Sequence, residues 1–213
     1  ANIYRYEDIL DRRDSMAQVI INELEQIRQE FAVPRKTVVE NAAEAVYIEK
    51  KVEEMEVVFL MDRFGYARTI DMTTYERNKE AADAENRFVF VCKNTGKVCL
   101  FTNTGQLHTM KVTDIPFGKF RDKGIPVDNI SNFDGEKEIV VAAESQTSLN
   151  LYRMIFVTRQ AMMKVVDGGE FDVAKRTVAA TKLAENDQVV SVAVMKEQKQ
   201  VVLQSADGYF LKF

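Results

Sequence analysis

The segment FLMDRFGYARTI, residues 59–70, reads as an apolar strand, a tight turn and a second strand that carries a basic residue. Three degenerate copies follow it: LFTNTGQLHTMK at 100–111, IFVTRQAMMKVV at 155–166 and VLQSADGYFLKF at 202–213. Their turn residues are 40, 55 and 48 residues apart, at Gly65, Gly105, Gln160 and Gly208. A strand-built repeat with a period in this range favours propeller blades over one closed barrel.

Around each repeat, alternating and short apolar runs predict a meander of three strands. The predicted strands, blade by blade, are 45–48, 56–61 and 66–70; 88–92, 97–102 and 107–112; 139–143, 151–157 and 161–166; 189–194, 201–204 and 209–213. The polar connectors at 71–87 and 113–138 could each supply a fourth strand to a neighbouring blade. We therefore predict a mainly β, propeller-like fold of about four blades, the last of them incomplete, preceded by an N-terminal α-helix.

The N-terminal part has the pattern of a helix over residues 6–31, where apolar side chains recur mostly at three- and four-residue steps. Ser15 could cap a second start within it, and Pro34 ends it. The helix is either a solvated element that docks by a narrow apolar stripe or one arm of an antiparallel pair whose partner lies outside this chain. We therefore predict a helical segment over 1–40, the end of a coiled-coil arm, and a β domain over 41–213.

The chain has a formal net charge of −4, and its acidity belongs to the N-terminal part. Residues 1–56 carry 8 basic and 13 acidic side chains, whereas residues 57–213 carry 21 and 20. Within residues 88–131 there are 6 basic against 3 acidic side chains. A sheet domain near neutrality can thus present a basic strip, which attracts polyanions.

The sequence contains no recognisable self-contained active site. Its one histidine, His108, lies in a predicted strand and is of the kind that usually packs. Cys92 and Cys99 lack the spacing of a zinc site; a cross-strand disulfide is conceivable, but two buried thiols are the commoner case. We predict no catalytic residue, no metal ligand and no cofactor here. The absence of a long apolar run or a signal peptide predicts a soluble, cytoplasmic protein.

Three segments together resemble the A subunit of bacterial type IIA DNA topoisomerases, that is, gyrase or topoisomerase IV. IINELEQIRQEFAVPRKTVVEN (20–41) is similar to the end of the family's long coiled coil, and MDRFGYARTIDMTTYERN (61–78) to its first blade. LFTNTGQLHTMKVTDIPFGKFRDKGIPVDNIS (100–131) carries the most specific likeness. The resemblance implies a β-pinwheel, a propeller-like disc of four-stranded blades that exchange strands, of which this chain holds a part.

The resemblance also implies a non-catalytic function. Duplex DNA would bend around the rim of the disc and be presented to a cleavage core upstream of this chain. The implied partners are double-stranded DNA, the B subunit, and another copy of the A chain, the last through regions outside this sequence. ATP and Mg²⁺ would be used by other regions of the parent enzyme, at the bacterial nucleoid. The seven tyrosines here would then not be catalytic.

Gyrases carry a glycine-rich basic box in the connector after the first blade. The corresponding segment here, TTYERNKEAADAENRF (73–88), has Arg77 and Lys79 but no glycine, and acidic residues follow. Within the resemblance, this difference favours topoisomerase IV.

Candidate DNA contacts are the basic residues at turns and connectors, because wrapping DNA without reading sequence requires mainly phosphate neutralisation. They are Arg63, Arg68, Arg77, Lys79, Lys97, Lys111, Lys119, Arg121, Lys123, Arg159 and Lys164. Lys119, Arg121 and Lys123 form the strongest local cluster, because Gly118 and Gly124 would let backbone approach a phosphate. Two alternatives stay open: a propeller that binds proteins, and a structural spacer without DNA binding. Residues 201–203 and 209–213, in the incomplete repeat, are expected to pair with another element or another copy.

Overall fold

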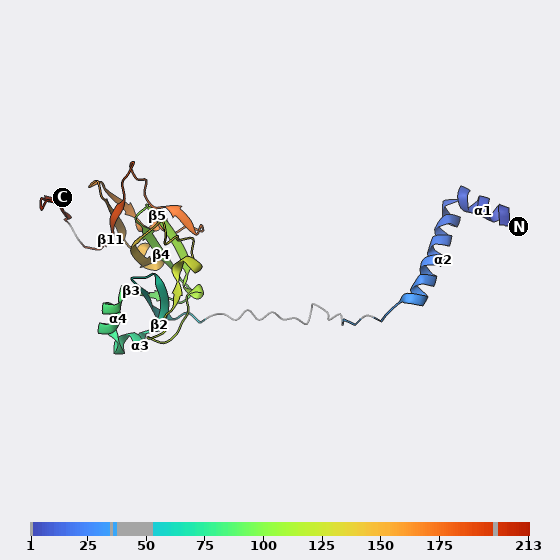
Figure 1. Cartoon of the computed structure of the whole chain (residues 1–213), viewed down its shortest axis with the longest axis horizontal. Coiled ribbons are helices and arrows are strands. Elements are labelled where there is room, and N and C mark those ends of the chain that lie inside the picture. The colour runs from blue at the N-terminus through green and yellow to red at the C-terminus, as the bar shows by residue number, and fades with distance from the viewer. Residues whose placement is uncertain (1, 35, 38–52, 198–199) are drawn as a thin grey trace. The chain divides into compact units, whose positions relative to one another are not determined.

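The computed structural model describes residues 2–34, 36–37, 53–197 and 200–213 (Figure 1). The chain divides into two units, Ala1–Lys50 and Lys51–Phe213. The predicted domain boundary at residue 40 and the predicted strand at 45–48 lie outside the described residues.

The N-terminal unit contains two helices, α1 (Asn2–Asp11) and α2 (Arg13–Phe31), where the sequence predicted one. The single helix is wrong because Arg12 between them has extended backbone, with φ −116° and ψ 116°. Ser15 does not cap the restart; it lies within α2, and its hydroxyl donates to Asp8 Oδ2 at 2.6 Å across the break. No side chain of either helix is buried, so the apolar stripe of α2 is exposed.

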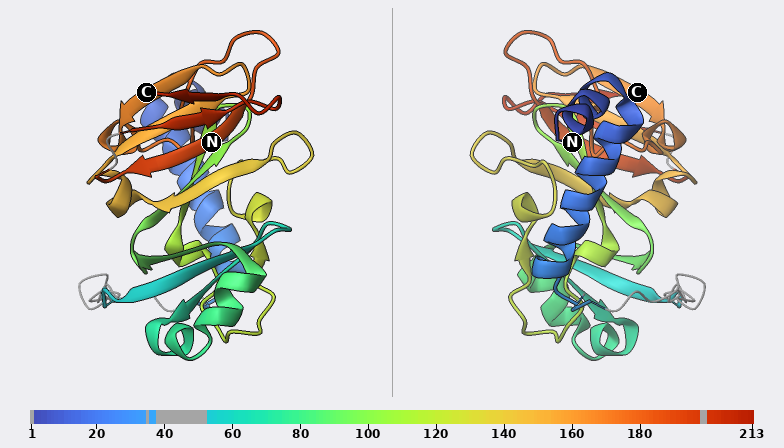
Figure 2. Two further views of the ribbon diagram at one scale, coloured as in Figure 1. Left: turned by 90° about the vertical axis from the view of Figure 1, so that its left-hand side faces the viewer. Right: turned by 90° about the vertical axis from the view of Figure 1, so that its right-hand side faces the viewer.

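The second unit is built of antiparallel sheets, each centred on one of the successive hairpins (Figures 1 and 2). The mainly β prediction is thereby confirmed. The first sheet has the order β3 (Asn86–Lys93), β1 (Glu56–Asp62), β2 (Tyr66–Asp71), β6 (Ile125–Pro126). The second has the order β10 (Thr177–Ala179), β5 (Gln106–Lys111), β4 (Lys97–Thr102), β7 (Val140–Ser145). The third is β11 (Val189–Met195), β8 (Arg153–Thr158), β9 (Met163–Asp167), and a hairpin of β12 (Val202–Gln204) and β13 (Phe210–Lys212) follows.

Blade membership differs from the prediction. The strands expected to open the second, third and fourth blades instead pair with the preceding hairpin: β3 with β1, β7 with β4 and β11 with β8. In addition, β6 and β10 lie beyond the next hairpin in sequence and pair back with β2 and β5. The expectation that a connector gives a strand to a neighbouring blade is thus confirmed for 113–138, which supplies β6, but it is wrong for 71–87, which folds mainly as two helices. Alternating apolar residues show that a strand has a buried face, but not which strand it pairs with.

The second sheet packs between the first and the third sheets, and its strand β4 is therefore buried on both faces. Val98 and Leu100 of β4 pack with Val57 and Phe59 of the first sheet. Cys99 and Phe101, which alternate with them along β4, belong to the core shared with the third sheet, where the ring centroids of Phe101 and Phe156 are 5.6 Å apart. This double burial explains the uninterrupted apolar run of the repeat.

The connector after β2 folds into two short helices, α3 (Met72–Arg77) and α4 (Lys79–Glu85). Asp71 caps α3 by accepting the Thr74 N–H at 2.8 Å, and Ala82 of α4 packs under the first sheet against Leu60. The remaining helical turns are α5 (Gln146–Leu149), η2 (Val112–Asp114), η3 (Val127–Asn129) and η4 (Gly168–Phe171). Among the helices that the structure describes, none combines the length and apolar character needed to cross a membrane.

Cys92 and Cys99 are buried free thiols, so the reduced interpretation is confirmed. Burial raises the pKa of each thiol to about 12. Because the thiolate is the reactive form, we expect both to resist a disulfide reagent such as DTNB at neutral pH and to react once the protein is unfolded in guanidinium. Rapid labelling of two thiols in the folded protein, followed by absorbance, would contradict this burial.

Candidate nucleic-acid interface

Two lysines of the second blade lie side by side at the end of its hairpin. Lys97 and Lys111 are cross-strand partners in the β4–β5 ladder, so both side chains leave the same face of the sheet. The corresponding pairs are Val57 with Asp71 in the first sheet and Arg153 with Asp167 in the third. Like charges directly opposite each other destabilise a sheet, so an anion at the Lys97–Lys111 pair would be favoured.

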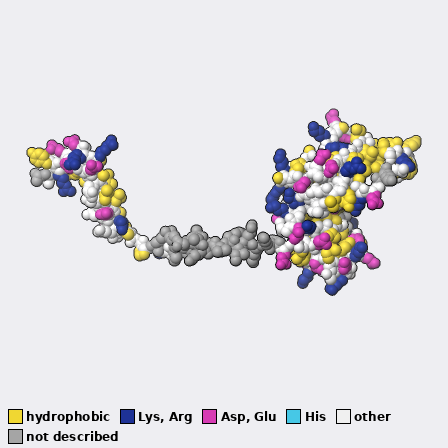
Figure 3. All heavy atoms as spheres, turned by 180° about the vertical axis from the view of Figure 1, so that it is seen from behind, with side chains coloured by type: hydrophobic (Ala, Val, Ile, Leu, Met, Phe, Trp, Pro, Cys, Tyr) yellow, Lys and Arg dark blue, Asp and Glu magenta, His cyan; other side chains and the backbone are white. Residues whose placement is uncertain are grey.

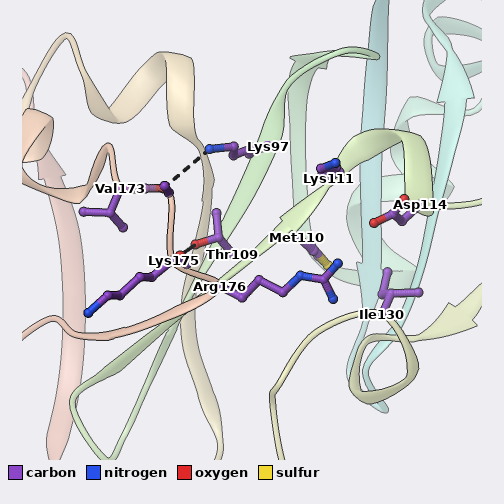
Figure 4. Close-up of a pocket in the computed structure, with 10 residues that line it drawn as sticks. Lys97, Thr109, Met110, Lys111, Asp114, Ile130, Val173, Lys175 and Arg176 are labelled. Atoms are coloured by element: carbon purple, nitrogen blue, oxygen red, sulfur yellow. Dashed lines mark hydrogen bonds between the residues drawn. The ribbon is translucent and has the colours of Figure 1, made fainter.

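The segment leading into β10 brings further cations to this place. The Thr109 N–H donates to the Arg176 carbonyl at 2.8 Å, and the Thr109 hydroxyl donates to the Lys175 carbonyl at 3.4 Å. Lys97 Nζ donates to the Val173 carbonyl at 3.5 Å. These backbone contacts hold the segment alongside β5, and Lys175 and Arg176 line the same pocket as the lysine pair. In Figure 4 the Arg176 side chain extends toward Ile130 and the Lys175 side chain extends in the opposite direction.

The side chains surround a small open pocket, which we call the basic groove. Its volume is about 80 Å³, and it is lined by Lys97, Thr109, Met110, Lys111, Asp114, Ile130, Val173, Ala174, Lys175 and Arg176. Four of these residues are cations and one is a carboxylate. In the described part of the chain, none of the four cations has an ion-pair partner within 4.0 Å. A pocket of this size and charge suits one phosphate-sized anion.

The other predicted contacts are distributed over the second unit. Arg77 and Lys79 are exposed on α3 and α4, Arg63 and Arg159 at hairpin turns, and Lys164 on β9. On the face shown in Figure 3, Lys and Arg side chains are interspersed with Asp and Glu, and a group of them lies along one edge of this unit. Of the eleven predicted DNA contacts, two line the basic groove, Lys97 and Lys111.

Arg68 is placed differently from the rest. It is 8% exposed on β2, and its guanidinium lies over the ring of Phe120, 5.8 Å from the ring centroid. Its side chain therefore packs the connector against the first sheet, and a phosphate would reach it only after this packing opens.

The loop with Lys119, Arg121 and Lys123 is exposed, but its glycines serve the fold. Gly124 has φ +80°, and a Cβ there would overlap the carbonyl oxygen of Ala67 on β2. The Gly118 N–H already donates to the Thr69 carbonyl at 3.0 Å. Gly124 thus allows the loop to lie against β2, and the Gly118 N–H is already bonded to that strand. Whether the three cations bind DNA stays a prediction.

Lys175 and Arg176 were missed by sequence reasoning. The signal available was the basic pair itself, next to Thr177 in the connector after the third hairpin. Their position beside β5 depends on strand exchange from the following blade, which periodicity does not encode.

A family model described as DNA gyrase C-terminal domain, beta-propeller, matches residues 96–146 and 153–195, the second and third blades. The curated relatives include the A subunits of two DNA gyrases. That of Lawsonia intracellularis is 26% identical over 98% of this chain, and that of Helicobacter pylori strain J99 is 26% identical over 96%. The chain is thus similar to DNA gyrase A subunits over nearly its whole length. The resemblance found in the sequence is thereby confirmed, and within the family this chain corresponds to the C-terminal region. It spans about a quarter of the length of these curated relatives, 27% and 26%.

Solved structures agree on the fold. The C-terminal domain of DNA topoisomerase IV aligns with a TM-score of 0.66 at 22% identity, over 76% of this chain and 52% of that one. The E. coli ParC C-terminal domain aligns with a TM-score of 0.59 at 15% identity, over 74% and 64%. These likenesses support the propeller-type architecture of this chain.

Proposed function

We propose that residues 41–213 bind and bend duplex DNA without reading its sequence and present it to the strand-passage core of a type IIA topoisomerase. The observation that carries this proposal is the basic groove. Four cations from three chain segments, without an ion-pair partner in the described part of the chain, meet there around a pocket of phosphate size. Exposed cations on the first and third blades would extend the contact along the DNA. Lys119, Arg121 and Lys123 belong to that extension.

The energetics of such binding are those of counterion release. If about six phosphates are neutralised, the slope of log K against log salt is about −5, and affinity falls about a thousandfold between roughly 50 and 200 mM salt. A surface that binds a protein through apolar contacts has a much flatter salt dependence.

The test is fluorescence anisotropy of this chain with short and long duplexes across a salt series. We expect a steep salt slope and tighter binding to the longer duplex, because a bent path contacts more phosphates. Flat, length-independent binding would support the protein-interaction alternative, and no binding even at low salt would support the spacer.

We further propose that the parent enzyme resembles topoisomerase IV in activity, with dimerisation through other regions and ATP hydrolysis supplied together with a B subunit, at the bacterial nucleoid. The support is the connector between β2 and β3 of the first sheet, which folds as α3 and α4 and contains no glycine between Asp71 and Glu85. Tyr75 also donates to Asp83 at 3.1 Å across the two helices, on an acidic surface unlike a basic box.

The curated relatives carry the gyrase name, so gyrase and topoisomerase IV have to be distinguished by the activity of the enzyme. An enzyme reconstituted with its B subunit should decatenate linked circles; efficient negative supercoiling of relaxed plasmid would overturn this assignment.

A further inference from the structure

The chain's one histidine is buried and makes hydrogen bonds to a partly exposed polar cluster that the DNA-binding proposal does not use. His108 on β5 is 2% exposed. Its Nε2 lies 2.6 Å from Glu138 Oε2, and its Nδ1 lies 3.1 Å from Thr177 Oγ1. Asn132 Nδ2 donates to the same Thr177 oxygen at 3.1 Å, and the Phe133 ring packs edge-on against the imidazole.

One proton assignment satisfies every group in this cluster. The His108 Nε2–H donates to the Glu138 carboxylate, and the Thr177 hydroxyl donates to Nδ1 while its oxygen accepts from Asn132. A network whose central imidazole is buried favours the arrangement of backbone segments that keeps this ring hydrogen-bonded. Here it joins β5, the loop before β7, and β10.

β10 is the element that needs such fixing. It has three ladder positions, Thr177 with His108, Val178 with Leu107 and Ala179 with Gln106, and of these three residues Val178 alone packs against the apolar core. A slip of one residue would turn Thr177 away from the histidine. A slip of two would place Ala179, which has no polar side-chain atom, or Lys175, which has no acceptor, opposite His108.

We propose that His108, Glu138 and Thr177 are positioning residues that fix the register of β10 and thereby hold Lys175 and Arg176 at the basic groove. The link between network and groove is covalent and short, since Arg176 immediately precedes Thr177 and its carbonyl accepts from Thr109, the residue after His108. The effect on DNA rests on the proposed function; the effect on register does not.

The test removes one hydroxyl without changing shape. In Thr177→Val, we expect the Thr109 amide to exchange with deuterium about tenfold faster, because the network loses the Asn132 and Thr177 bonds. His108→Gln should act in the same direction, and Glu138→Gln, which retains an acceptor, should stay near the unmodified rate. Thr158→Val is the matched control: Thr158 is buried, and its hydroxyl accepts from Met162 in the third blade, away from the groove.

The DNA readout is the salt slope of the same variants. Loss of two phosphate contacts makes the slope less steep by about 2 in Thr177→Val. Unchanged Thr109 exchange in both Thr177→Val and His108→Gln would overturn the proposal. Faster exchange with an unchanged slope would overturn the link to the groove. Faster exchange in a chain whose unmodified form binds no DNA would refute the proposed function and leave the register role standing.

Discussion

Replacing Lys111, Lys175 and Arg176 together by glutamine is expected to weaken duplex binding about a hundredfold or more at roughly 50 mM salt. The reason is counterion release: two or three lost phosphate contacts make the salt slope less steep by about 2 to 3. Lys97 is left in place because it donates to the Val173 carbonyl and so supports the segment. Anisotropy across the salt series measures both quantities.

The same triple variant is expected to be slightly more stable than the unmodified protein, although it binds DNA less tightly. Removing the charge of Lys111 relieves its repulsion with Lys97 across the ladder, so the free energy of unfolding should rise by a few tenths of a kcal/mol. Lower affinity in a protein that is at least as stable would exclude unfolding as the cause.

A charge-matched control is available elsewhere on the second unit. Lys93, Lys137 and Lys182 are exposed, and the first two already pair with Glu54 and Asp134. Changing these three to glutamine alters the net charge equally and should reduce affinity only severalfold. An equal loss in both triple variants would show that overall charge, and not the groove, governs binding.

Gly124→Ala is expected to destabilise the protein by about 2 to 4 kcal/mol, because the residue combines a strained φ with an unavoidable backbone overlap. Gly124 has φ +80°, and a Cβ added there would overlap the carbonyl oxygen and carbonyl carbon of Ala67 on β2. The change would displace β6 from the first sheet, where Ala67 pairs with Ile125. Chemical denaturation gives the free energy of unfolding directly.

The control is Gly135→Ala, where the nearest atom to an added Cβ is in the Phe133 ring at 3.6 Å, an ordinary contact. This variant should stay within about 1 kcal/mol of the unmodified protein. If Gly124→Ala were fully stable and lost only DNA affinity, the glycine would serve the ligand, and its packing role would be wrong.

Local chemistry explains which parts of the fold were predictable. The four hairpins were, because apolar strand pairs around Gly65, Gly105 and Gly208 each have a turn residue with positive φ in the structure. The third turn uses Ala161, at φ 59°, next to the predicted Gln160. The break at Arg12 and the two helices at 72–85 were not predicted, since a few backbone angles and the packing of Ala82 decide them.

The candidate site was predictable only in part. Lys97 and Lys111 were found as basic residues of one hairpin, and Arg68 was selected by the same criterion although Phe120 covers it. Residue type and turn position indicate charge, but whether a long side chain packs or stays free depends on what lies above it.

By itself, the sequence determined the strand-turn-strand repeat, the mainly β class and the resemblance to a family, because these depend on hydrophobic periodicity, turn residues and motifs that are local in the chain. The tertiary structure alone decided that β6 and β10 cross to neighbouring sheets, and hence that Lys175 and Arg176 meet Lys97 and Lys111. The physical reason is that backbone hydrogen bonds are the same for every strand. The choice of partner, and the basic groove that it creates, comes from packing between blades that are distant in sequence.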